Sequence, residues 1–248
     1  MLLKQTTAVV INSRDHGESD VIITLYSLEN GKFTAIAKGA KRSKKRFVNR
    51  LELFTLLDIQ YEPGKRSTMA RLDQAEVFNH FSVLRTDYLR YAAAQLICES
   101  LYFWTKENDY EPELFALLLW ALNSLDQHGY SKETIIFFFL KMLSILGYQP
   151  NLSNCTQCGS LDAINAPFCF RTGANGIICA KCNKELEKSS RTMALGTIKL
   201  LLKAQNLSLE KLDRLRFSKP SAAEAFDMLK QYSTHLLQRE LNSWKPLI

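Results

Sequence analysis

Six cysteines occur in this chain, and four of them form two Cys-x-x-Cys pairs, Cys155 with Cys158 and Cys179 with Cys182. A turn of this kind places two thiolates at the separation that a tetrahedral Zn²⁺ ion requires. Gly159 follows the first pair, and a residue without a Cβ eases the sharp turn of such a knuckle. With 20 residues between the pairs, the spacing predicts one structural Zn²⁺ ion with four thiolate ligands and no open coordination position.

Other interpretations of the cysteines stay open at this point. The four thiols could be reduced core residues whose spacing is accidental, or a thioredoxin-like redox pair, although the strand–helix context of that motif is missing. Of the remaining two, Cys169 has apolar flanks and Cys98 lies on the apolar stripe of an expected helix. We expect both to be small buried residues rather than spare ligands.

Residues 1–75 have the pattern of short β-strands. Five runs rich in apolar and β-branched residues are expected as strands: 6–11, 21–28, 32–37, 53–61 and 68–72. Asn30-Gly31 between the second and third runs is a strong hairpin signal, because both residues tolerate a positive φ. Five strands without helical periodicity indicate a small β-barrel, which we expect to span residues 1–78.

Helical spacing of apolar residues begins near Glu76 and predicts that the rest of the chain is mainly α-helical. Glu111-Pro112 is expected to start one helix, since proline is tolerated in a first turn. Ser131 is expected to cap another helix that ends near Gly147. That helix is apolar on nearly every side, so it should lie at the centre of a helix bundle.

The helical pattern is interrupted at residues 150–188, which hold Pro, Asn, Gly and the paired cysteines. Helices are expected to resume at residues 193–206 and again at a capping box, Ser221-x-x-Glu224. We therefore expect an α+β multidomain fold. An N-terminal β-barrel precedes an all-α helical domain at residues 79–248, with a four-cysteine zinc-binding insertion at residues 150–188.

The net charge of +7 is concentrated in residues 38–50, called the basic segment from here on. The rest of the chain carries 25 basic and 25 acidic side chains. A local excess of positive charge attracts a polyanion. The seven cations of the basic segment are Lys38, Lys41, Arg42, Lys44, Lys45, Arg46 and Arg50.

The basic segment lies between two expected barrel strands, and this position favours nucleic acid as its ligand, since barrel loops flank the strand face used for such ligands. Arg14 is a weaker candidate contact, expected on the loop between the first two strands. The nearby aromatic residues are expected mainly in the core, with one or two as candidates for stacking on bases: Tyr26, Phe33, Phe47 and Phe54. A solvated loop without a partner and a docking site for an acidic protein are the alternatives.

The sequence carries no pattern that indicates catalysis. Phosphate-loop, dinucleotide-binding and His-Glu-x-x-His motifs are absent, the four histidines are scattered, and the acidic residues do not cluster as a two-metal nuclease needs. No apolar stretch approaches the ~20 residues needed to span a bilayer, and the N-terminus lacks the layout of a signal peptide. We therefore expect a cytoplasmic protein that is not an enzyme and has no membrane partner.

Short motifs along the chain form a pattern that is typical of one protein family. In the first third they are Ala8-Val9-Val10-Ile11, Gly17-Glu18-Ser19-Asp20-Val21-Ile22, Gly31-Lys32 and, most distinctively, Ala37-Lys38-Gly39-Ala40-Lys41-Arg42-Ser43. Further along they are the Leu51 to Tyr61 strand, Gln74-Ala75-Glu76 and Arg239-x-Leu241-x-Ser243. Together these stretches resemble the RecO family of bacterial recombination mediators over nearly the whole chain.

The resemblance implies an N-terminal OB-fold, followed by a helical domain with a zinc-binding insertion. It implies a non-catalytic activity in DNA repair. Such proteins bind single- and double-stranded DNA, anneal complementary strands and help load recombinase onto strands coated by single-strand-binding protein (SSB). The implied location is the nucleoid.

The implied partners are RecR and the acidic C-terminal tail of SSB. An acidic tail with an apolar end needs a hydrophobic groove rimmed by cations, and the helical region offers Lys141, Arg85 and Arg90 among others. Two further functions stay open. One is a zinc-containing adaptor whose basic loop docks an acidic protein partner, and the other is an RNA-binding zinc protein. An enzyme is the least favoured.

Overall fold

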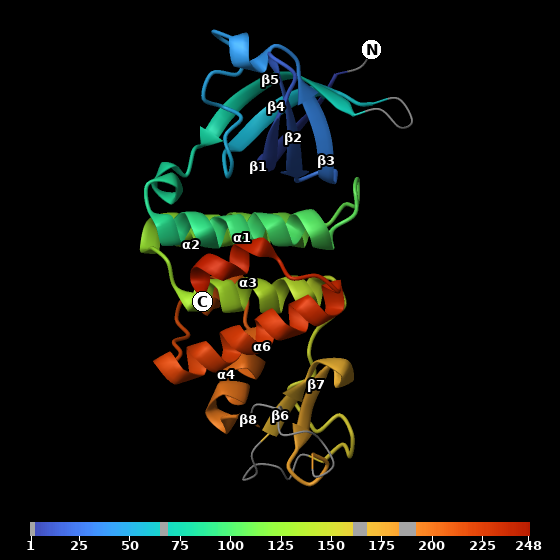
Figure 1. Ribbon diagram of the computed structural model, residues 1–248, viewed down its shortest axis with the longest axis vertical. Helices are drawn as coiled ribbons and strands as arrows, with labels where there is room; N and C mark the ends of the chain where they lie inside the picture. The colour runs from blue at the N-terminus through green and yellow to red at the C-terminus, as the bar shows by residue number, and fades with distance from the viewer. Residues whose placement is uncertain (1–2, 65–68, 161–167, 184–191) are drawn as a thin grey trace. The chain divides into compact units, whose positions relative to one another are not determined.

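The computed structural model describes residues 3–64, 69–160, 168–183 and 192–248 (Figure 1). The chain divides into two compact units: residues 1–129 together with 241–248 form the first, and residues 130–240 form the second. The division expected at residue 78 instead separates the barrel from the helices within the first unit, and it stays a prediction.

The first unit contains a closed five-stranded barrel with the strand order β1-β2-β3-β5-β4. Neighbouring strands are antiparallel except β3 and β5, which are parallel and, among the described residues, pair at Ala35–Ala70 and Ile36–Arg71. Alternate apolar side chains fill the interior. The strands are β1 (Lys4–His16), β2 (Asp20–Ser27), β3 (Gly31–Ala37), β4 (Leu56–Glu62) and β5 (Ala70–Asn79). The expected OB-like barrel is confirmed.

The turn between β2 and β3 depends on Gly31. Its φ is +62°, in the left-handed region that favours glycine. A Cβ at this position would also lie 1.9 Å from the carbonyl oxygen of Asp109, which follows α1 (Tyr88–Trp104). The hairpin predicted from Asn30-Gly31 is therefore confirmed, and its glycine also permits a close approach of the chain beyond that helix.

Strand β5 is longer than the sequence pattern indicates. It continues to Asn79, so the expectation that helical structure begins near Glu76 is wrong. The cause is an irregularity at Asp73, where the register with β4 shifts and the inward–outward alternation is broken. Beyond this point Ala75 faces the barrel interior, whereas the side chain of Phe78 is exposed.

The barrel and the first helix are joined by a buried lysine. Lys32 of β3 is 9% exposed, and its ammonium group donates to the carbonyls of Tyr102 and Thr105 at the C-terminal end of α1. A cation at this end of a helix is favoured because the last carbonyls lack partners within the helix. Burial lowers the pKa of Lys32. One side chain of the barrel thus caps the helix that supports it.

Two longer helices follow β5 in the first unit, and the second of them begins where the sequence indicates. Asp87 accepts the backbone N–H of Arg90 at 2.8 Å and caps α1. The next helix, α2 (Pro112–His128), starts at the predicted proline. The short 3-10 helix η2 (Ser82–Arg85) links β5 to α1.

The C-terminal residues of the chain return to the first unit. The 3-10 helix η5 (Asn242–Leu247) packs against α1 and buries Trp244 completely. The carboxylate of Glu99 on α1 accepts the backbone N–H groups of Asn242 at 3.1 Å and Ser243 at 2.9 Å. The last residues of the chain are therefore part of the structure that supports the barrel.

The second unit is built on α3 (Lys132–Ile145), whose residues 134–140 are all buried. Ser131 accepts the N–H of Thr134 at 3.1 Å, so both the predicted cap and the predicted central position are confirmed. Two other helices, α4 (Leu195–Asn206) and α6 (Lys219–Leu237), pack against α3, and the short α5 (Leu209–Leu212) joins them. In the described parts of the chain, no helix has the length and apolar character needed to cross a membrane.

A small sheet in the order β7-β6-β8 completes the second unit. Its strands are β6 (Phe168–Arg171), β7 (Gly176–Cys179) and β8 (Thr192–Met193). The described part of the predicted insertion therefore contains strands, whereas residues 161–167 and 184–188 of it lie outside the described residues.

The start of α6 differs from the prediction. Ser218 is the N-cap and accepts the N–H of Ser221 at 3.2 Å, so the capping box assigned to Ser221 and Glu224 is wrong. The carboxylate of Glu224 instead accepts from the backbone N–H of Ala194 at 3.1 Å and from the hydroxyl of Thr197 at 2.6 Å. Glu224 therefore caps the neighbouring helix α4, and sequence spacing alone does not reveal such a contact.

We predict that Trp244→Ala lowers the free energy of unfolding by about 3–5 kcal/mol, because it leaves a cavity against α1. Urea denaturation followed by circular dichroism measures the loss, and hydrogen exchange of the α1 amides should report it. Lys245→Ala, an exposed neighbour in the same segment, is the control and should change stability by less than about 0.5 kcal/mol. Equal stability of the two variants would contradict the structural role of the C-terminal segment.

Candidate nucleic-acid interface and metal centre

The basic segment begins where β3 ends, and its backbone is tied to the β1–β2 turn. It opens with the short 3-10 helix η1 (Ala40–Arg42). The N–H of Gly39 donates to the carboxylate of Asp20 at 2.8 Å, and the N–H of Lys41 donates to the carbonyl of Ser19 at 3.0 Å. The Gly39 hydrogen bond lowers the pKa of Asp20. These contacts fix the start of the segment without using any of its positive charges.

The second half of the basic segment is anchored by apolar side chains. Phe47 is 4% exposed and Leu51, just beyond the segment, is 9% exposed; both belong to the barrel core. The hydroxyl of Ser43 accepts the N–H groups of Arg46 at 3.0 Å and Phe47 at 3.2 Å, which forms a local turn. Burial of these anchors turns most of the charged side chains outward.

The seven cations of the basic segment fall into three groups. Lys38, Lys44 and Lys45 are exposed and form no ion pair with any residue that the structure describes. Three more lie in ion pairs: Lys41 with Asp15 at 2.8 Å, Arg42 with Glu18 at 3.2 Å, and Arg46 with Asp73 at 3.9 Å. Arg50 is half-buried and donates to the carbonyl of Ala75 on β5.

These groups differ in how freely they can meet a ligand. The pair of Arg42 with Glu18 is largely in solvent, with 72% and 91% of the two side chains exposed. Exposed pairs contribute only about 0–1 kcal/mol, so a phosphate can replace the carboxylate at little cost. Arg50 is different, because its guanidinium group satisfies a carbonyl of the barrel. We therefore regard Arg50 as a structural residue first and a candidate contact second.

Arg14 is exposed, but it does not lie on the loop between the first two strands as expected. It belongs to β1 and pairs with Ile22 of β2, and the turn itself is residues 17–19. The apolar run ends before the strand does, because β1 continues with polar residues that pair with the apolar residues 21–23 of β2. Arg14 stays a candidate contact on a strand.

The aromatic residues considered for base stacking are all in the core. Tyr26, Phe33, Phe47 and Phe54 are each no more than 4% exposed, so the expectation that one or two of them stack on bases is wrong. Exposed aromatic rings are found instead at Phe78 and Tyr88, which are 64% and 70% exposed. The outward register of β5 is the signal in the sequence that could have identified Phe78 as exposed. The irregularity at Asp73 breaks the alternation of the strand and hides this signal.

The cations considered for the rim of a peptide groove are bonded to backbone carbonyls. Arg85 donates to the carbonyls of Leu53 and His80. Arg90 donates to the carbonyl of Asp126 at 2.7 Å, near the end of α2. Lys141 donates to the carbonyl of Gln205 at 2.7 Å, at the end of α4. These three side chains therefore have structural roles, and they are poorly suited to the rim of a groove.

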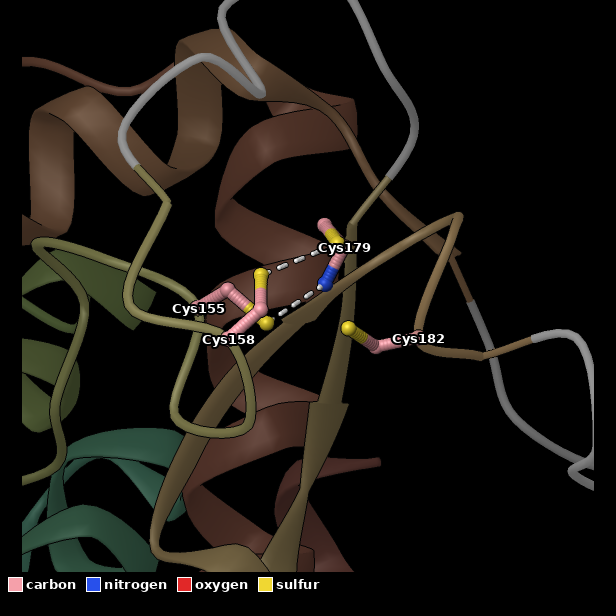
Figure 2. A group of neighbouring side chains, drawn as sticks. All are labelled: Cys155, Cys158, Cys179 and Cys182. Carbon is pink, nitrogen blue, oxygen red and sulfur yellow. Dashed lines mark hydrogen bonds between the residues drawn. The ribbon is translucent and has the colours of Figure 1, made fainter.

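The four paired cysteines come together in the second unit, as Figure 2 shows. All four Sγ atoms lie within 4.8 Å of one another. Cys155 and Cys158 belong to a turn after α3 in which Gly159, with a φ of +70°, donates to the carbonyl of Cys155 at 2.9 Å. Cys179 ends β7, and the next turn carries Cys182. Two knuckles thus face each other, as the spacing predicts.

The thiols of this cluster influence one another. Burial raises the pKa of Cys155, but backbone N–H groups, that of Cys179 first among them, outweigh burial and lower it to about 6. Hydrogen bonds to the Cys158 and Cys179 thiols raise the pKa of Cys182 to about 12. Four thiolates crowded together repel one another, and a bound cation is what removes that repulsion.

The cluster fits a tetrahedral metal ion. Four sulfurs at about 2.3 Å from a Zn²⁺ ion lie about 3.8 Å from one another, and Cys158 Sγ is 3.9 Å from Cys179 Sγ. The backbone N–H of Cys179 donates to Cys155 Sγ at 3.4 Å, a contact that stabilises a metal-bound thiolate. The donor set is all sulfur, which suits a soft or borderline ion and leaves no open position.

The other two cysteines are buried, as predicted. Cys98 is fully buried in α1, and burial raises its pKa. Cys169 is 2% exposed in β6, where the side-chain amide of Asn183 donates to its sulfur at 3.2 Å. Neither belongs to the four-cysteine cluster.

Comparison with known proteins agrees with these features. A family model described as recombination protein O N terminal matches residues 1–81, and one described as recombination protein O C terminal matches residues 85–245. DNA repair protein RecO of Syntrophobacter fumaroxidans is 33% identical over 247 residues, covering 100% of this chain and 98% of its own length.

Two further proteins of the same name are similar along their length. That of Desulfatibacillum aliphaticivorans is 32% identical and covers 96% of this chain and 93% of its own. That of Syntrophus aciditrophicus is 31% identical and covers 98% of this chain and 94% of its own. Both family models and these relatives together span the barrel, the helices and the cysteine cluster. The chain therefore belongs to the RecO family of DNA repair proteins.

Proposed function

We propose that this chain is a non-catalytic mediator that binds single- and double-stranded DNA, anneals complementary strands and helps load recombinase onto SSB-coated strands. The basic segment carries the proposal, because Lys38, Lys44 and Lys45 are exposed on a backbone that is anchored to the barrel. Membership in a family of DNA repair proteins supports DNA as the polyanion.

Neutralisation of charge is what annealing requires from the protein, since two polyanionic strands repel each other. The exposed lysines of the basic segment can contact phosphates without first leaving an ion pair. The cations in exposed ion pairs add theirs when a phosphate oxygen replaces the carboxylate. Each contact releases counterions from the DNA, and this release drives binding. No bond is made or broken in these steps, so no catalytic residue is assigned.

RecR and the acidic C-terminal tail of SSB are the protein partners that we propose. Family membership supports both. The acidic tail is also complementary to a chain whose formal net charge is +7.

For the metal centre we propose one structural Zn²⁺ ion held by Cys155, Cys158, Cys179 and Cys182. The ion would supply a cross-link between the two knuckles. The chain's own residues shape the site: Gly159 permits the first turn, and the N–H of Cys179 donates to the sulfur of Cys155. The arrangement ties the turn after α3 to the end of β7.

A second candidate function is an adaptor whose basic segment docks an acidic protein. The ion pairs of Lys41 with Asp15 and of Arg42 with Glu18 favour it, because the segment already binds carboxylates. Competition between single-stranded DNA and an acidic SSB-tail peptide for the basic segment separates the two functions. Displacement of the DNA by peptide at low concentration would favour the adaptor.

We predict that binding of single-stranded DNA weakens steeply with salt. If about five cations contact phosphates, log K falls with log salt with a slope of about −3.5. Replacing Lys38, Lys44 and Lys45 by Glu should reduce the slope to about −1.4 and slow strand annealing, because three of those contacts are lost. Fluorescence anisotropy of a labelled oligonucleotide across salt concentrations measures the slope.

The matched control for this experiment replaces Lys4, Lys106 and Lys245 by Glu. These lysines are exposed in the same unit, and the substitutions change the net charge by the same amount. This control variant should retain most of the slope of log K against log salt. Binding that does not respond to salt, or equal losses in both triple variants, would remove the basic segment from the proposed function.

We predict that the purified protein holds one zinc ion per chain and that the double substitution Cys155→Ser with Cys158→Ser loses it. The expected result is a lower melting temperature and faster proteolysis of the second unit, since metal binding supplies folding energy locally. Elemental analysis and limited proteolysis are the measurements. Cys98→Ala, in the first unit, is the control and should keep the metal. A metal-free wild type of full stability would contradict the structural zinc.

A further inference from the structure

Exposed aromatic side chains gather in residues 78–91 of the first unit. Phe78 at the end of β5 is 64% exposed, Tyr88 at the start of α1 is 70% exposed, and Tyr91 one turn later is 39% exposed. Large aromatic side chains bury most of their surface in ordinary cores, so several exposed rings in one short stretch indicate a binding surface. None of these rings was among the aromatic residues that the sequence indicated for base stacking.

The strand that carries Phe78 is bonded directly to the basic segment. Arg46 pairs with the carboxylate of Asp73 at 3.9 Å, and Arg50 donates to the carbonyl of Ala75. Both partners lie on β5, a few residues before Phe78. In Figure 1 the light-blue chain that follows η1 runs down beside this end of β5.

The helix that carries Tyr88 is also tied to the chain that leaves the basic segment. Arg85, just before α1, donates to the carbonyl of Leu53 and to the hydroxyl of Thr55. The ring of Tyr91 meets the ring of Phe54 edge-on, with 5.4 Å between the ring centres. The exposed aromatic residues and the basic segment therefore border the same part of the barrel.

Two carboxylates near these residues, those of Asp87 and Glu52, are engaged, whereas that of Glu76, two residues before Phe78 on β5, is exposed. Asp87 caps α1 through the N–H of Arg90, and Glu52 pairs with Arg85 at 3.4 Å. A strand of negative phosphates that leaves the basic segment can therefore pass this surface with little repulsion from these two groups.

We infer that Phe78 and Tyr88 stack on unpaired bases of a single strand whose phosphates are held by the basic segment. The inference rests on the proposed DNA-binding function and assigns that function a second, uncharged component. Aromatic stacking tolerates any base sequence because every base has a π-face. Tyr91 already contacts Phe54, so its ring forms the wall of the surface and not a stacking platform.

This component acts on single strands alone. Bases of a duplex are stacked on each other and have no free face, whereas the phosphates of both forms are accessible to cations. Stacking therefore supplies a preference for single strands that positive charge does not supply. The two components also separate by salt, because cations set the slope of log K against log salt and stacking shifts log K at constant slope.

The test uses the full-length protein with Phe78→Ala and Tyr88→Ala, singly and together. Each substitution should weaken binding of a labelled oligothymidine by about 5- to 150-fold. The salt slope and the affinity for a duplex of equal length should stay within about twofold of the wild type. Tyr88→Phe should retain the affinity, since it keeps the ring. The wild type should bind an oligonucleotide with abasic positions more weakly than an intact strand. The double variant should bind the two oligonucleotides with equal affinity.

The matched controls are Tyr110→Ala in the first unit and Tyr148→Ala in the second, which remove rings that are 59% and 49% exposed. Neither should change the affinity. The stacking inference would be overturned if the double variant kept its affinity for single strands, or if it lost affinity for duplex DNA equally. In either case, salt-dependent binding by the wild type would still support the proposed function. A wild type that binds no single strand would overturn both.

Discussion

The barrel of the first unit closes through a parallel contact of two residue pairs between β3 and β5. Farther along, arginines of the basic segment bond the carbonyls of Asp73 and Ala75 on β5, where a neighbouring strand would otherwise pair. An unpaired strand edge is a liability, and this segment covers it while Phe47 fills the core beneath. The positive charges are consequently held at one place, because the chain that carries them completes the barrel. The cationic and aromatic parts of the proposed DNA surface both depend on this closure.

Local signals in the sequence were sufficient for much of the fold. The four-cysteine cluster, the hairpin at Gly31 and the caps of α2 and α3 depend on residues a few positions apart, and all were predicted correctly. The errors came from contacts between distant residues. The irregularity at Asp73 is set by pairing with β4, and Glu224 caps a helix 30 residues away. Periodicity carries no information on either.

Positive charge outside the basic segment serves a different purpose. Lys32, Arg90 and Lys141 each donate to carbonyls near the C-terminal end of a helix, where the helix dipole and the unpaired carbonyls favour a cation. Counting charges along the sequence treats these side chains as equal to the exposed lysines. Their positions in the fold separate cations that stabilise helices from cations that are free to meet a ligand.

The return of the C-terminus to α1 affects the order in which the protein is completed during synthesis. The barrel leaves the ribosome first, yet the helix beneath it receives Trp244 only after the whole second unit has been made. Until residues 241–248 have been made, the nascent chain keeps an open apolar site on α1. A stop codon in the stretch that encodes residues 130–240 would therefore leave the first unit without Trp244 as well.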